Sequence, residues 1–325
     1  MPAALEGIRI LDLTRLLPGA VATGWLAEFG AEVIKVEQPS SAERESYPAV
    51  FEQTNRGKKS VEIDLKVDKE RFLKLAATAD VLIEGNRPGV MERLGLGYET
   101  LRAVNPRLIY VALTGYGSEG PYASFAGHDV NYLAMSGVLD AIGPAVVPNV
   151  PLADLAGGSM QAVIGTLLAI QARHRTGHGQ RVDISMTDGS TALLPVASAG
   201  GLNLLSGRFA CYHVYPAAAN TFVAVGALET KFWANLCREL GLEELIAQQY
   251  VEDQAPVIQA IENVLATAPA EEWFERLGAK DCCLTPVRAA AHGAAPHTPK
   301  LSDTPRSTLA RAPRLGEHNE ESSSQ

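Results

Sequence analysis

The chain has 325 residues, of which 46% are hydrophobic and 20% charged, a balance typical of soluble globular proteins. Its net charge of −9 argues against general nucleic-acid binding, which needs a basic surface. The N-terminal residues lack the pattern of a signal peptide, and no uninterrupted apolar run is long enough to span a membrane. We expect a cytoplasmic protein with reduced thiols, because no CxxC pair occurs among its four cysteines, Cys211, Cys237, Cys282 and Cys283.

Short β-rich runs alternate with helical patterns in the first half of the chain. The predicted strands lie at residues 8–13, 32–37, 60–65, 80–85 and 107–115. Helical apolar spacing occurs at 68–79 and 98–105, and an earlier helix ends near Gly30. This alternation predicts an α/β fold with a parallel sheet.

The second half has a different organisation. Residues 157–175 are apolar on almost every side, which predicts a buried helix, and a strand is predicted at 180–186. Helical patterns also occupy residues 228–240, 255–268 and 269–279. We predict a large α/β domain at 1–190, an Ala-, Gly-, Ser- and Pro-rich linker at 191–220, a small domain at 221–285, and an irregular tail at 286–325 that returns toward the large domain.

Several common motifs are absent. No GxGxxG follows the first predicted strand, and the sequence has no Walker A, HExxH or GxSxG pattern, so metal and phosphoryl-transfer chemistry have no support. Instead, "NRGKKS" (55–60) and "GNRPGVMERLG" (85–95) place basic residues in loops beside predicted strands. Two such clusters in an acidic protein favour a polyanionic ligand such as a nucleotide diphosphate, and solvated loop charge is the alternative for each cluster alone.

Four residues are candidates for acid/base chemistry. His128 and Asp129 are adjacent, and a lone histidine is more often structural than catalytic. Asp154 precedes two glycines and a helix, where it is either a helix-start residue or a reactive carboxylate beside open backbone N–H groups. Glu229 occupies the start of another helix, an ordinary position for glutamate.

Longer stretches of the chain resemble the family III CoA-transferase superfamily. They include "GIRILDLTRLLPG", "GAEVIKVEQP", "NRGKKSVEIDLK", "NPRLIYVALTGYG", "RTGHGQRVDISM" and "GEHNEE", and they cover the chain almost from end to end. The resemblance implies an interlocked homodimer of ring-shaped chains. Each chain would have a Rossmann-like large domain that holds most of the CoA and a smaller α+β domain.

Within the superfamily, "AGHDVNYLAMSGVL", "ADLAGGSM" and "VAVGALETKFW" are similar to the α-methylacyl-CoA racemase branch. This similarity implies that His128 and Asp154 are the catalytic acid/base pair, with Glu229 beside the histidine and contributed by either chain of the dimer. The transferase branch keeps the aspartate as a nucleophile that accepts the acyl group, but normally lacks the histidine. The two alternatives are therefore a racemase of 2-methylacyl-CoA and a CoA-transferase that forms an aspartyl anhydride on Asp154.

The same resemblance implies a set of CoA contacts. They are Ile63, Asp64, Leu65, Lys66, Gly85, Asn86, Arg87, Pro88, Gly89, Arg93, Gly127, Asp129 and Tyr132. An arginine that often follows the second strand in the family is replaced by Gln38. The segment between His128 and Asp154 is shorter than in the racemases, and the tail after Pro286 is contracted.

Racemisation next to a thioester needs two groups, one on each face of the α-carbon, in opposite protonation states. An imidazole with its ordinary pKa of ~6.5 suits this task, and an aspartate does so once desolvation raises its pKa from ~3.9. Backbone N–H groups around Gly157 and Gly158 are the expected donors to the enolate oxygen. We expect no metal and no prosthetic group, with coenzyme A present as part of the acyl-CoA substrate.

Overall fold

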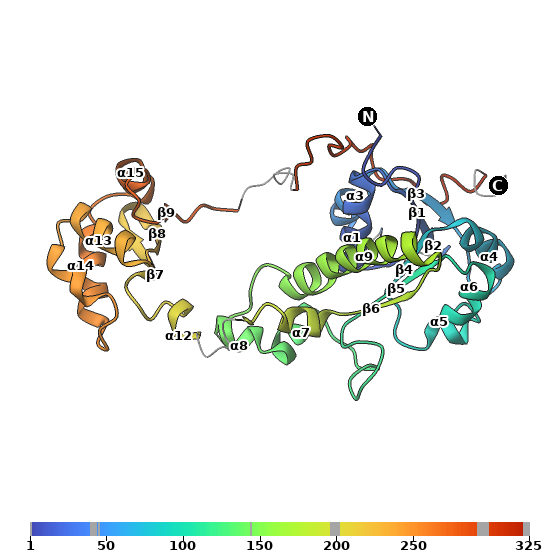
Figure 1. The fold of residues 1–325 in the computed structure, drawn as a ribbon, viewed down its shortest axis with the longest axis horizontal. Helices are drawn as coiled ribbons and strands as arrows, with labels where there is room; N and C mark the ends of the chain where they lie inside the picture. Colours follow the sequence, from blue (N-terminus) through green and yellow to red (C-terminus); the bar gives the residue numbers. More distant parts are fainter. Residues whose placement is uncertain are drawn as a thin grey trace. The chain divides into compact units, whose positions relative to one another are not determined.

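The computed structural model describes residues 2–39, 44, 46–143, 145–195, 202–290 and 299–320. By its internal contacts the chain divides into two compact units (Figure 1). The first comprises residues 1–194 and 297–325, and the second comprises residues 195–296. Parts of the predicted linker (196–201) and of the predicted tail (291–298 and 321–325) lie outside the described residues.

A six-stranded parallel sheet forms the centre of the first unit, as the alternation of elements predicted. Its strands are β1 (Arg9–Leu13), β2 (Glu32–Glu37), β3 (Lys59–Glu62), β4 (Val81–Glu84), β5 (Ile109–Thr114) and β6 (Arg181–Ser185). Their order in the sheet is β3-β2-β1-β4-β5-β6, which is that of doubly wound nucleotide-binding folds. The order reverses between β1 and β4, and ligands of such sheets bind outside the carboxyl ends of the strands at this point.

Helices cover both faces of this sheet. One face packs against residues of α1 (Leu17–Glu28), α7 (Asp129–Ser136) and α9 (Gln161–Thr176). The other packs against α4 (Lys69–Thr78), α5 (Val90–Arg93) and α6 (Tyr98–Val104). The unit also contains α3 (Pro48–Thr54), α8 (Val138–Ile142) and α10 (Met186–Thr191). Because both faces are covered, the central strands β4 and β5 are nearly continuous apolar runs, whereas the edge strands β3 and β6 mix polar and apolar residues.

The apolar segment after residue 152 differs from its prediction. A π-helix, η1 (Ala153–Met160), precedes α9, so the helical segment starts before residue 157. Only one side of α9 is buried, through Ala162, Thr166, Ala169 and Ile170. The expectation of burial all round is wrong, because Ile164, Leu167 and Leu168 lie on the opposite side and are exposed.

Length and composition would allow the combined helix Ala153–Thr176 to cross a membrane. Such helices also occur in the cores of soluble proteins, and here one side packs on the central sheet. The segment also begins with a carboxylate, Asp154, and ends with Arg173 and Arg175. The segment is therefore a core helix with one exposed apolar side.

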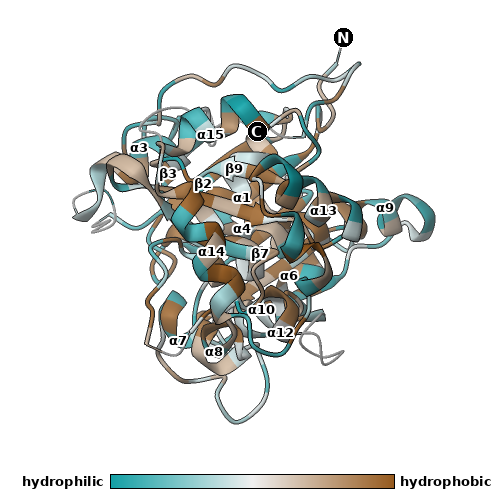
Figure 2. Ribbon diagram, turned by 90° about the vertical axis from the view of Figure 1, so that its left-hand side faces the viewer, coloured by the Kyte–Doolittle hydropathy of each residue, from teal (hydrophilic) through white to brown (hydrophobic). Residues whose placement is uncertain are grey.

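The second unit is a small α+β structure. Its antiparallel sheet contains β7 (Tyr212–Ala217), β8 (Thr221–Gly226) and β9 (Leu284–Pro286). Its main helices are α13 (Thr230–Glu239), α14 (Ala255–Leu265) and α15 (Ala270–Leu277), with short helices α12 (Leu202–Leu205), η2 (Ala218–Asn220) and η3 (Glu243–Gln248). Hydrophilic and hydrophobic residues alternate along α13 and α14 (Figure 2), and the hydrophobic ones, including Trp233, form the core.

Strand β7 lies within the range predicted as a linker, so that prediction is wrong for residues 212–217. Because the surrounding residues are mostly Ala, Gly, Ser and Pro, the sequence pattern did not indicate this short strand. Its central residue is held in place by burial and by a hydrogen bond. Tyr215 is fully buried, and its hydroxyl donates to the carbonyl oxygen of Ala210 at 2.7 Å.

Residues near the C-terminus lie along the edge strand β3. The amide of His318 donates to the carbonyl oxygen of Ser60 at 2.9 Å, and the amide of Ser60 donates to His318 Nδ1 at 3.1 Å. Asn319 Oδ1 accepts a hydrogen bond from the amide of Glu62 at 2.9 Å. The described part of the tail therefore covers a sheet edge that would otherwise expose unpaired backbone groups.

A buried ion pair joins three segments at the carboxyl end of β1. Lys58 Nζ lies 3.0 Å from Asp12 Oδ2, and both side chains are fully buried. The ammonium group also donates to Thr23 Oγ1 at 2.7 Å and to Asn55 Oδ1 at 2.8 Å. Burial opposes the charge of Asp12, but Lys58, Lys35 and two threonine hydroxyl groups outweigh it and hold the pKa of Asp12 well below its ordinary value.

We expect the substitution Asp12→Asn to lower the free energy of unfolding by about 3–5 kcal/mol, because it leaves the Lys58 charge buried without its counter-ion. Chemical denaturation at neutral pH measures this loss. The control is Asp140→Asn on α8, an exposed aspartate whose replacement should change stability by at most about 0.5 kcal/mol. Equal unfolding free energies for the two variants would contradict the role assigned to the ion pair.

Candidate active site

His128 lies directly before α7, at the N-cap position. Its backbone is extended there, and its amide donates to Asn131 Oδ1 at 3.0 Å. The helix begins as the amide of Asn131 donates to the carbonyl oxygen of His128 at 2.8 Å. The backbone of His128 is therefore held by the cap, while its side chain is exposed and accessible to a ligand.

Glycines allow the loop before His128 to pack closely on aromatic rings. A Cβ atom at Gly127 would lie 2.7 Å from the hydroxyl oxygen of Tyr116, and one at Gly115 would lie 2.3 Å from the ring of Tyr132. The rings of Tyr116 and Tyr132 meet edge to face with centroids 5.1 Å apart. The Tyr132 hydroxyl donates to the carbonyl oxygen of Gly127, so the helix that follows His128 also holds the loop that precedes it.

Asp154 occupies the first turn of η1 and is half-buried. Its amide donates to Asp129 Oδ1 at 2.9 Å, which joins the start of η1 to the start of α7. The carbonyl oxygen of Asp154 accepts a hydrogen bond from Ser159 Oγ at 3.1 Å. The carboxylate of Asp129, the sequence neighbour of His128, is therefore hydrogen-bonded to the backbone of Asp154.

Burial and charge together change the proton affinity of Asp154. Burial, followed by the negative charge of Asp129, raises the pKa of Asp154 to about 6, and His128 acts in the opposite direction. Asp154 in turn contributes, after burial, to raising the pKa of Tyr132 to about 12, while Arg87 opposes this shift. Asp154 is therefore within electrostatic reach of His128, Asp129 and Tyr132, and Tyr132 is also within reach of Arg87.

Glycines also determine how η1 packs. A Cβ atom at Gly157 would lie 2.4 Å from the carbonyl oxygen of Met186, and one at Gly158 would lie 3.0 Å from Met186 Cγ. Both glycines are buried against α10. Their absent side chains therefore serve close helix packing, and the oxyanion role of their N–H groups stays a prediction.

The predicted CoA contacts gather at the carboxyl ends of two strands. Residues 63–66 follow β3, with Ile63 and Leu65 buried and Lys66 exposed. Residues 85–89 follow β4, and Gly89 has a φ of 81°, a conformation that glycine adopts without strain. A Cβ atom there would also lie 3.0 Å from Arg93 Nη1 on α5. Both segments lie at the edge of the sheet where α/β folds bind ligands.

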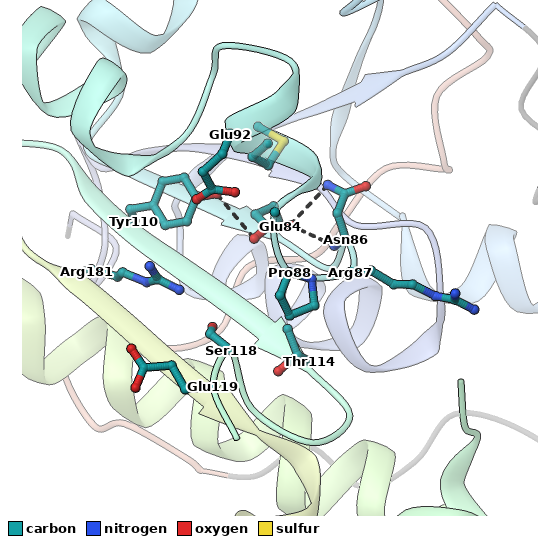
Figure 3. Close-up of a pocket in the computed structure, with 12 residues that line it drawn as sticks. Glu84, Asn86, Arg87, Pro88, Glu92, Tyr110, Thr114, Ser118, Glu119 and Arg181 are labelled. Carbon is teal, nitrogen blue, oxygen red and sulfur yellow. Dashed lines mark hydrogen bonds between the residues drawn. The ribbon is translucent and has the colours of Figure 1, made fainter. Parts of the chain in front are cut away.

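Glu84, which was not predicted from the sequence, holds the segment at residues 85–89 in place. Glu84, the last residue of β4, is buried, and its Oε2 accepts hydrogen bonds from the amide of Asn86 at 2.7 Å and from Asn86 Nδ2 at 3.0 Å (Figure 3). Tyr110 donates to Glu84 Oε1 at 3.2 Å, and burial raises the pKa of Glu84. These groups line a cavity of about 150 Å³ that also includes Arg87 and Arg181. An acidic residue at the end of an apolar strand was the available signal.

Glu229 belongs to the second unit and directly precedes α13. Its side chain is exposed, and its charge contributes, after burial, to raising the pKa of Cys283. Its pairing with His128, from either chain, stays a prediction. Within the described ranges, no group of three or more His, Cys, Asp or Glu residues is arranged to hold a metal ion.

Comparison with known proteins identifies the family. Residues 5–298 match CoA-transferase family III. Human alpha-methylacyl-CoA racemase is 38% identical over 302 residues, covering 87% of this chain and 78% of the relative. Acetyl-CoA:oxalate CoA-transferase of Acetobacter aceti is 36% identical over 301 residues, covering 83% of this chain and 77% of the relative.

The fold is also that of solved structures. The crystal structure of Rv3272 from Mycobacterium tuberculosis superposes with a TM-score of 0.82 and 29% sequence identity, covering 98% of each chain. This match extends over both units, and the sequence relatives include racemases and transferases. Proteins of both kinds act on CoA derivatives, as their names state. The chain described here is an enzyme of CoA-transferase family III.

Proposed function

We propose that the enzyme inverts the 2-methyl centre of a 2-methylacyl-CoA by a two-base 1,1-proton transfer. The observation that carries this proposal is a half-buried carboxylate, Asp154, with its pKa raised to about 6 in electrostatic contact with the exposed imidazole of His128. An ordinary aspartate is too weak a base for an α-proton, and burial reduces this mismatch. The racemase relatives support the same reaction.

In the proposed reaction, one group removes the α-proton and the other returns a proton on the opposite face. When Asp154 is the base, the C–H bonding electrons move into the thioester to form an enolate, and protonated His128 then supplies a proton to the α-carbon. In the reverse direction the two roles exchange. Backbone N–H groups near the start of η1, including those of Gly157 and Gly158, would stabilise the enolate oxygen.

The proposed substrate is an acyl-CoA thioester held without a prosthetic group or metal. Its CoA part would contact residues 63–66, residues 85–89, Arg93, Gly127, Asp129 and Tyr132. The working assembly would be an interlocked homodimer in the cytoplasm, without nucleic-acid or membrane partners. The exposed apolar side of α9 supports self-association, and the partner chain could then bring Glu229 to His128.

Exchange of the α-hydrogen with deuterated solvent tests the reaction directly. Active enzyme should introduce deuterium at C2 of a 2-methylacyl-CoA, as measured by mass spectrometry. His128→Ala and Asp154→Ala should each slow exchange by about 10²- to 10⁴-fold, because each removes an acid/base group. His174→Ala, at an exposed histidine of α9, is the matched control and should exchange at the wild-type rate. Absence of deuterium with folded wild-type enzyme would contradict the proposal.

The pH dependence of kcat/KM provides a second test. The active form holds one proton between His128 and Asp154, so the same bell-shaped profile is expected for both enantiomers. Activity should fall below about pH 6, because protonation of Asp154 there removes the carboxylate that acts as a base. A limb near pH 4 would show that Asp154 has the ordinary proton affinity of a carboxyl group.

CoA transfer between carboxylic acids is the second candidate function. It is favoured by the transferase relatives and requires the Asp154 carboxylate to attack the thioester carbonyl, which breaks the C–S bond, releases CoA as its thiolate and leaves a mixed anhydride. Hydroxylamine would trap this anhydride as a hydroxamate on Asp154, detectable by peptide mass spectrometry. We expect no hydroxamate when a free-acid acceptor and acyl-CoA are supplied. Its formation, lost in Asp154→Ala but kept in His128→Ala, would favour transfer over racemisation.

A further inference from the structure

The side chain of Asp129 has a partner that the family resemblance did not indicate. Although Asp129 adjoins His128 in the sequence, its Oδ1 accepts a hydrogen bond from the amide of Asp154 at 2.9 Å, 25 residues away. Asp129 is the first residue of α7, and Asp154 is the second residue of η1. One carboxylate therefore joins the two helix starts that carry the candidate acid/base pair.

We propose that Asp129 is a positioning residue for Asp154: its hydrogen bond fixes the first turn of η1, and its negative charge favours the protonated form of the Asp154 carboxyl group. This inference deepens the proposed function and rests on Asp154 being the reacting carboxyl group. It assigns to the Asp129 side chain a role that is separate from any CoA contact.

The hydrogen bond has a structural reason. Near its start, a helix leaves backbone N–H groups without partners inside the helix, and the amide of Asp154 is one of them. The residue before η1, Leu152, makes no side-chain cap. Asp129 supplies the acceptor from another helix, so the position of Asp154 depends on that of α7. Because α7 also holds His128, the spacing of the two catalytic groups depends on this bond.

The charge effect follows from the same proximity. A like charge nearby disfavours ionisation of a carboxyl group. Besides burial, the groups that act on the pKa of Asp154 are Asp129, which raises it, and His128, which lowers it. The elements in contact with η1 carry these other charged or titratable groups: Glu28 on α1, Tyr132 on α7, Arg173, His174 and Arg175 on α9, Asp188 on α10, and Arg181 and Asp183 on β6. Asp129 is therefore the negative charge with the largest effect on the pKa of Asp154.

Two substitutions separate the hydrogen bond from the charge. Asp129→Asn keeps a side-chain oxygen for the Asp154 amide and removes the charge, whereas Asp129→Ala removes both. Asp140→Asn on α8 is the control, because it removes an exposed aspartate that does not contribute to the pKa of Asp154. Unfolding midpoints of all three variants show whether each protein is folded.

The first measurement is NMR titration of the full chain labelled with ¹³C at the aspartate carboxyl groups, with Asp154→Asn used to assign the resonance. We expect the titration midpoint of Asp154 to fall by about one pH unit in both Asp129 variants. It should be unchanged in Asp140→Asn. A wild-type midpoint in Asp129→Asn would overturn the proposed effect of charge.

The second measurement is solvent exchange of the Asp154 amide proton. Protection should be kept in Asp129→Asn and lost in Asp129→Ala, and equal protection in the two variants would overturn the positioning role. Neither measurement needs substrate or turnover, so both remain decisive if the α-hydrogen exchange experiment fails. If that exchange succeeds, kcat/KM of Asp129→Ala at its own optimal pH should be about 10- to 100-fold below that of Asp129→Asn.

Discussion

The buried ion pair between Asp12 and Lys58 is the constraint on which the ligand-binding edge of the sheet depends. It joins the end of β1 to α1 and to the loop before β3, beside the point where the strand order reverses. Breaking such a pair is costly because each charge, once alone, remains away from water. Lys58 is one of the basic residues whose clustering favoured an anionic ligand, but its ammonium group is used inside the protein. The ligand would therefore meet the other basic residues of these loops, which the ion pair helps to place.

Helix starts carry the candidate chemistry, and small residues determine where those starts lie. Glycines 157 and 158 let η1 approach α10, while Gly127 lets the loop before His128 contact tyrosine rings. Asp154 is consequently half-buried instead of solvated, and this burial is the largest contribution to its raised pKa. The proton affinity of the carboxyl group thus follows from backbone packing around it. A side chain larger than hydrogen at Gly157 would clash with the carbonyl oxygen of Met186 and force η1 away from α10.

The sequence predicted what depends on local pattern and failed where distant segments decide. The central strands β4 and β5 were predictable because burial on both faces makes them nearly continuous apolar runs. The uncovered side of α9 was not, since apolar composition alone does not show whether a second surface covers it. Strand β7 was concealed by small residues around the buried Tyr215. At the site, motifs indicated His128 and Asp154 as candidates, but the hydrogen bond from the Asp154 amide to Asp129 spans 25 residues and has no sequence signature.

The environment of Asp154 bears on the choice between proton transfer and acyl transfer. With its pKa raised to about 6, the Asp154 carboxyl group is still mostly ionised near neutral pH, so it can serve as a nucleophile or as a base. A group that must also return a proton to an enolate has a further requirement, because its proton affinity must be close to that of its partner. The raised pKa brings the carboxyl group closer to the ordinary proton affinity of an imidazole, which suits the two groups to exchange protons. Together with the position of His128 at the start of α7, this match supports the proposed inversion at the α-carbon.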